Sequence, residues 1–178
     1  MIEQFTKIGD VKILKKLEEI PLAEMNSMPP AYRSLRDEAM HKIGIGTIRA
    51  MKSVIKGIFL PVMLNREYTL REKMNIWRGK WSATSTDLWN QILATNLTTK
   101  VTKLDIPVYF LEGIYDYTCS YTLAKEYFAK LKAPVKGFYT FGQSAHSPLF
   151  EEPEQMERIL QEDVLKDEIN YSDINTRQ

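Results

Sequence analysis

An aspartate and a histidine each follow an apolar segment of this chain, and both residue types orient or move protons in enzymes. Asp116 lies in the loop that comes after the apolar run 106–111. His146 lies in the loop 142–148, which follows the alternating run 135–141. Ligands of open α/β sheets bind beyond the carboxyl ends of the strands, and parallel strands bring those ends to one edge. We therefore expect the carboxylate and the imidazole to lie within hydrogen-bonding reach.

A carboxylate beside an imidazole fixes its tautomer and stabilises the imidazolium that forms when the ring takes a proton. Asp116 and His146 are therefore the candidate catalytic acid and base, and no residue is assigned to a metal or a cofactor. A nucleophile is missing, because the sequence contains no Gly-x-Ser-x-Gly. Cys119 is disfavoured because it lies at an expected helix start, and Ser144 and Ser147 because neighbours in an extended loop point apart.

The elements that would position these loops alternate between strand and helix. The runs 106–111 and 135–141 are predicted strands, the first with a proline near its start. Helices are predicted over 153–165 and over 120–131, whose buried side is expected to carry Leu123, Tyr127, Phe128 and Leu131. This βαβα order implies parallel strands covered by helices, so the expected fold class is α/β. Two strands alone do not make such a sheet, so the fold is expected to be partial.

The first half of the chain is predicted to be helical, over residues 10–20, 32–42, 47–56, 69–79 and 86–94. Asp10 is a good N-cap, and Thr69 with Glu72 fits a capping box. The stretch 47–56 is amphipathic, with apolar residues on one side and basic residues on the other. We therefore divide the chain into a helical region (residues 1–98), an α/β region (residues 99–166) and a polar tail that is expected to fray (residues 167–178).

The length, charge and cysteine count exclude several classes of protein. With 178 residues, 44% of them hydrophobic, the chain can bury one sizeable core. A net charge of +1 gives no reason to expect a nucleic-acid partner. The single cysteine excludes an internal disulfide and a zinc site built on several thiolates, and it favours a cytoplasmic setting. We expect neither a signal peptide nor a membrane span, because the longest apolar run, 58–64, is short and contains proline.

The segments around the two loops resemble the α/β-hydrolase family. Residues 106–116 resemble its acid-bearing strand and loop, with Gly-x-x-Asp ending on Asp116. Residues 144–154 resemble the histidine loop and the helix after it, and residues 133–139 look like the final core strand of the proline-iminopeptidase-like branch. The helical residues 10–95 look like the cap of such enzymes. The order of acid before histidine also fits the family.

The chain departs from the family pattern in several ways. Many relatives have glycine where Ala145 stands, and proline near the position of Cys119 and Ser120. The nucleophile segment, the oxyanion loop and the first core strands are missing and would lie before Met1. The resemblance thus implies the C-terminal part of a serine hydrolase, inactive alone, that acts on an ester or peptide-like small molecule once a nucleophile-bearing segment completes it. It implies no cofactor.

A non-catalytic interaction protein is the alternative. The basic amphipathic stretch 47–56 could lie on an anionic membrane surface, although we favour a cap helix packed on its own neighbours. The strand before Asp116 also lacks the partner that the family places beside it, which leaves Val108 and Phe110 on an open edge. Because an unpaired strand edge is a template for association, we expect a homodimer or a higher homo-oligomer.

Overall fold

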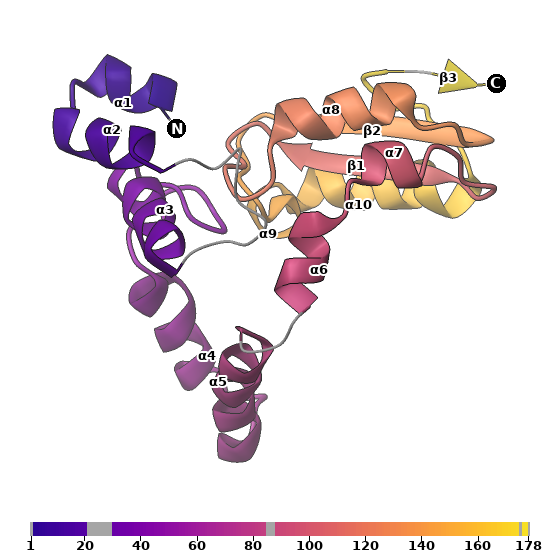
Figure 1. Ribbon diagram of the computed structural model, residues 1–178. Coiled ribbons are helices and arrows are strands. Elements are labelled where there is room, and N and C mark those ends of the chain that lie inside the picture. The colour runs from indigo at the N-terminus through magenta and orange to yellow at the C-terminus, as the bar shows by residue number, and fades with distance from the viewer. Residues whose placement is uncertain (1, 21–29, 85–87, 175, 178) are drawn as a thin grey trace. The chain divides into compact units, whose positions relative to one another are not determined.

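The computed structural model describes residues 2–20, 30–84, 88–174 and 176–177 (Figure 1). The chain forms two units, one made of Met1–Ile43 with Met51–Thr95 and the other of Gly44–Ala50 with Asn96–Gln178. In the described residues, the first unit is helical and the second holds a three-stranded sheet with helices. No helix in these residues is both long enough and apolar enough to cross a bilayer.

The first unit begins with three helices, α1 (Ile2–Ile8), α2 (Val11–Glu18) and α3 (Pro30–Lys42). As predicted, Asp10 caps α2, and its carboxylate accepts the backbone N–H of Ile13 at 3.3 Å. Helix α1 is an addition to the helices predicted from the sequence. The apolar faces of the three helices share one core, made of Phe5, Ile13, Leu17, Leu35 and Ala39.

The predicted amphipathic helix over 47–56 is wrong for most of its length. Ile45 and Arg49 form an isolated antiparallel bridge, and regular helical structure lies beyond it, in the π-helix η2 (Ile55–Phe59) and α4 (Leu60–Leu64). Ala50 has a φ of 61° and Gly44 one of 73°, which lie in the left-handed region that a right-handed helix excludes. The membrane-surface alternative thus keeps a helix only from Ile55 onward, and membrane binding stays a prediction.

Helix α5 (Leu70–Thr84) starts at the predicted capping box. The backbone N–H of Thr69 donates to the Glu72 carboxylate at 2.8 Å, and the N–H of Glu72 donates to the Thr69 hydroxyl at 3.3 Å. The helix continues past Gly79, because one interior glycine costs only about 1 kcal/mol. Two short helices follow, α6 (Leu88–Ala94) and α7 (Leu97–Lys100). The predicted start of α6 at Thr86 lies outside the described residues.

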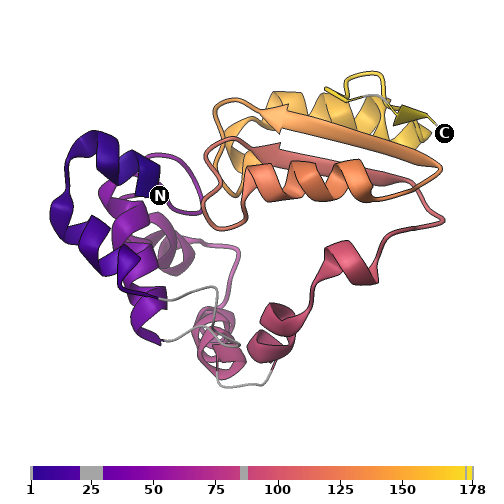
Figure 2. The same cartoon turned by 45° about the horizontal axis from the view of Figure 1, so that its top comes forward.

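The second unit contains the predicted parallel strands. Strand β1 (Val108–Gly113) pairs with β2 (Val135–Phe141), with Val108 opposite Lys136 and Gly113 opposite Phe141. Figure 2 shows both arrowheads at the same end of the sheet. The predicted α/β class and parallel pairing are confirmed. A third strand that the sequence did not predict, β3 (Thr176–Arg177), pairs antiparallel with β2.

The pleat of the strands sends alternate side chains to opposite faces, and a helix covers each face. Helix α8 (Tyr121–Lys130) packs Phe128 against Phe110 and Phe138, with ring centroids 5.5 and 5.4 Å apart. Helix α10 (Pro153–Glu162) packs on the other face, where the buried cluster comprises Tyr139, Phe141, Met156 and Ile159. The predicted burial of Leu123 on α8 is wrong, because this side chain is 64% exposed.

The expected fraying of the tail is also wrong for residues 167–174. The fully buried carboxylate of Asp163 accepts the Tyr139 hydroxyl at 2.8 Å and the backbone N–H groups of Asn170 and Tyr171 at 2.9 and 2.8 Å. The N–H of Asp173 donates to the Phe138 carbonyl of β2 at 2.8 Å. The tail thus covers the outer edge of β2, whereas β1 pairs, within the described strands, with β2 alone.

Candidate active site

Asp116 is held by the turn that follows β1. Its backbone N–H donates to the Gly113 carbonyl at 3.1 Å. One carboxylate oxygen, Oδ1, accepts the backbone N–H groups of Thr118 and Cys119 at 2.8 and 2.9 Å. The residue is only 6% exposed. The turn therefore fixes the carboxylate and leaves its second oxygen, Oδ2, to face another group.

The histidine loop is held by two carboxylates that follow it in sequence. Glu151 ends the short helix α9 (Pro148–Glu151) and accepts the backbone N–H of Ala145 at 2.7 Å. Glu152 accepts the N–H of Gln143 at 2.8 Å and the Ser144 hydroxyl at 2.6 Å. These bonds satisfy the backbone of the loop locally, so its path past His146 is well defined.

The loop after β1 that carries Asp116 (the acid loop, residues 113–118) and the loop after β2 that carries His146 (the histidine loop, residues 142–148) touch through their backbones. The N–H of Ile114 donates to the Phe141 carbonyl and that of Tyr115 to the Ser144 carbonyl, each at 3.1 Å. Gly113 permits this approach: a Cβ atom there would lie 2.1 Å from the Ala145 carbonyl oxygen. The glycine of the Gly-x-x-Asp motif is thus required by the close contact of the two loops.

The two candidate residues meet where the loops touch. Oδ2 of Asp116 lies 2.7 Å from Nδ1 of His146, so their predicted proximity is confirmed, while their catalytic role stays a prediction. An ionised carboxylate only accepts, so the pairing that suits a general base has Nδ1 as the donor to Oδ2 and leaves Nε2 to exchange a proton with another group. The His146 side chain is 40% exposed. The arrangement can orient a general base.

Sequence reasoning missed the part that residues 44–50 play in this unit. The backbone N–H of Arg49 donates to the same Glu151 carboxylate that holds the histidine loop, at 2.5 Å. Its guanidinium donates to the Gln143 side chain at 2.5 Å and lies 4.2 Å from the centre of the Tyr115 ring. No local pattern could have predicted these contacts, because 102 and 94 residues separate Arg49 from Glu151 and Gln143.

Glu112, at the end of β1, lies in the electrostatic field of the pair. Burial raises the pKa of its carboxyl, and repulsion from Asp116 raises it further, while His146 acts in the opposite direction. The site therefore holds a second carboxyl that resists ionisation beside the first.

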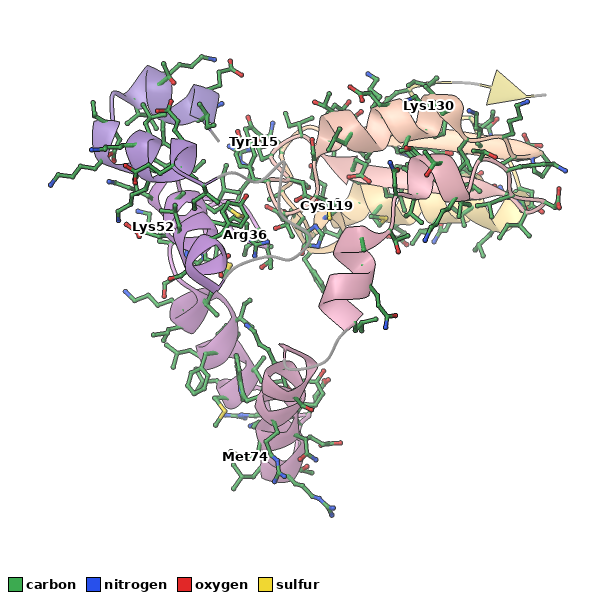
Figure 3. The ribbon with its side chains drawn as sticks, in the orientation of Figure 1. Arg36, Lys52, Met74, Tyr115, Cys119 and Lys130 are labelled. Atoms are coloured by element: carbon green, nitrogen blue, oxygen red, sulfur yellow. The ribbon has the colours of Figure 1, made fainter. Side chains whose placement is uncertain are left out.

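The three side chains weighed as nucleophiles have distinct surroundings. Ser144 is fully buried and donates to Glu152, so its oxygen is already engaged. Ser147 precedes Pro148 at the start of α9. Cys119 directly precedes Ser120, the N-cap of α8, and is exposed (Figure 3). Its sulfur lies within 4.8 Å of a ligand atom of both Asp116 and His146.

Comparison with known proteins gives one match of low identity. Over 96 residues, 54% of the chain, the sequence is 27% identical to the probable aminopeptidase YbaC of Bacillus subtilis. The matched region spans 30% of that protein's length. No family model matches the chain, and no solved structure matches it. The match indicates at most a distant relationship to a peptidase or hydrolase.

Proposed function

We propose that this chain is the C-terminal part of a serine hydrolase with the α/β-hydrolase fold, and that it supplies the triad acid Asp116 and the triad base His146. The observation that carries the proposal is the 2.7 Å contact between Oδ2 and Nδ1 beyond the ends of two parallel strands. The similarity to a probable aminopeptidase favours an amide or ester bond in a peptide-like small molecule as the substrate.

In this proposal, Nε2 of His146 takes the proton of a serine and later gives it to the leaving group. Asp116 stabilises the imidazolium that exists between these two proton transfers. The backbone N–H groups of Thr118 and Cys119 hold the Asp116 carboxylate in place for this role. The serine and the oxyanion donors come from a preceding segment or from a separate chain. The helical region, residues 1–98, serves as the cap.

The open edge of the sheet supports the same proposal. Within the described strands β1 pairs with β2 alone, although parallel sheets are normally extended and covered on both faces. A nucleophile-bearing segment that adds a parallel strand beside β1 would bring its serine to the edge where Asp116 and His146 lie.

The first test uses a fluorophosphonate probe, which labels activated serines, on this chain alone. We expect no labelling, because the sequence contains no Gly-x-Ser-x-Gly to supply an activated serine. The DNA just upstream should encode a Gly-x-Ser-x-Gly in the same or a shifted frame, and a protein extended to include it should be labelled.

The second test assigns the roles in the extended protein. His146→Ala should abolish labelling, and Asp116→Asn should slow it about 1,000-fold or more, since a triad without its acid loses the correct tautomer. His41→Ala, which removes the other histidine of the chain, is the matched control and should be labelled like the parent. Labelling that persists in His146→Ala would refute the assigned base.

A further inference from the structure

We propose that Cys119, His146 and Asp116 together form a binding site for a zinc-type divalent cation. One ligand atom from each residue, a thiol sulfur, an imidazole nitrogen and a carboxylate oxygen, lies within 4.8 Å of the other two. These are the three kinds of donor that zinc takes from proteins. Sulfur and imidazole nitrogen favour zinc over magnesium or calcium, which prefer oxygen alone.

The local fold brings the three ligands together. The turn after β1 places Cys119 beside the carboxylate, because its backbone N–H donates to Oδ1 of Asp116 at 2.9 Å. The contact between the two loops places His146 on the other oxygen, at 2.7 Å. The carboxylate is thus fixed at the base of the site, with one ligand supplied by its own loop and one by the neighbouring strand's loop.

The distances are close to those that an ion requires. Zinc bonds of about 2.0–2.3 Å in a tetrahedral site place neighbouring ligand atoms about 3.3–3.7 Å apart. The Asp116–His146 pair would open by about 0.6 Å as the ion replaces the shared proton, and the sulfur would move in by about 1.3 Å at most. The exposed positions of Cys119 and His146 permit such rotations, and the buried Asp116 serves as the anchor.

Three protein ligands leave the fourth zinc position open to water or to a competing ligand. The inference does not rest on the proposed function, because binding needs only these three side chains. It has a consequence for that function, however. An ion bound to His146 occupies the imidazole that a hydrolase would need as its base, so zinc would inhibit a completed enzyme.

The test adds cobalt(II), a spectroscopic substitute for zinc, to the full chain. We expect one ion per chain by titration calorimetry and a thiolate-to-cobalt charge-transfer band in the near ultraviolet. The composition makes the assignment direct, since the chain has one cysteine and two histidines. Cys119→Ser should abolish the band, and His146→Ala should weaken affinity about 100-fold, since even supporting groups around a metal are worth 10–100-fold. His41→Ala is the matched control and should bind like the parent.

A second measurement follows the thiol. Zinc should slow alkylation of Cys119 by iodoacetamide at least tenfold in the parent and in His41→Ala, but not in His146→Ala, and circular dichroism should confirm that each variant is folded. Cobalt that binds without a charge-transfer band, or binding equal in His146→Ala and the parent, would overturn the site. A chain that binds zinc but cannot be completed into a hydrolase would refute the proposed function and leave this inference standing.

Discussion

The contact between the acid loop and the histidine loop makes Gly113→Ala the sharpest perturbation of the site. The new Cβ would lie 2.1 Å from the Ala145 carbonyl oxygen and 2.4 Å from that of Ser144. Both atoms belong to the backbone, so no side-chain rotation can relieve the clash. The loops would have to separate by about 1 Å, because real contacts of this kind stay beyond about 3 Å.

The loss of folding stability in Gly113→Ala can be worked out from the atoms that must move. Overpacking a well-packed site costs about 1–3 kcal/mol. The separation also weakens the hydrogen bonds that Ile114 and Tyr115 donate across the contact, each worth about 1 kcal/mol. We therefore expect Gly113→Ala to lower the free energy of unfolding by about 2–4 kcal/mol. The same movement draws Asp116 away from His146.

Gly142→Ala is the matched control, because it makes the same chemical change in the histidine loop where no heavy atom lies within 4 Å of the new Cβ. It should change stability by less than about 0.5 kcal/mol. Guanidinium unfolding followed by circular dichroism gives the two free energies. Amide hydrogen exchange at Tyr115, faster only in Gly113→Ala, locates the change. Equal unfolding midpoints for the two variants would refute the close-contact argument.

Three further predictions concern the rest of the unit. Asp163→Ala should destabilise the protein by about 3 kcal/mol, because three donors lose their acceptor. Tyr139→Phe removes only one of those bonds and should cost about 1 kcal/mol. Equal losses of stability in urea unfolding would contradict the shared role of the Asp163 carboxylate. Burial and repulsion from Asp116 raise the pKa of the Glu112 carboxyl, so this carboxyl keeps its proton to higher pH in the folded state than in the unfolded state. The free energy of unfolding should therefore fall as pH rises above about 4.5. Glu112→Gln should therefore be more stable than the parent at about pH 7 and equal to it at about pH 3, and unfolding curves at the two pH values decide this. Sedimentation equilibrium at micromolar concentration should show a homodimer or a larger assembly. Ile106→Lys, at a 62% exposed position just before β1, should shift the equilibrium toward the monomer. A monomeric parent chain would count against association through the strand edge.

Several features of the fold could be predicted because their signals are local. Strand β2 has the predicted bounds, since its alternation reflects a pleat that repeats every two residues. The caps at Asp10 and Thr69 bond to partners three residues away, so the sequence itself contains both members. The meeting of Asp116 and His146 follows from one further rule, that parallel strands end at the same edge.

Only the tertiary structure decided the features whose two members are distant in sequence. Arg49 and Glu151 are 102 residues apart, so the amphipathic pattern of 47–56 suggested a helix at a position where Arg49 instead bonds to the Glu151 carboxylate. The polar tail looked frayed because its acceptors, Asp163 and the β2 backbone, are not visible in its own composition. Leu123 has the spacing of a buried residue but lies 64% exposed, since periodicity defines a helix face and not what covers it. A sequence pattern encodes local geometry, whereas burial and long-range hydrogen bonds depend on partners that only the folded chain brings near.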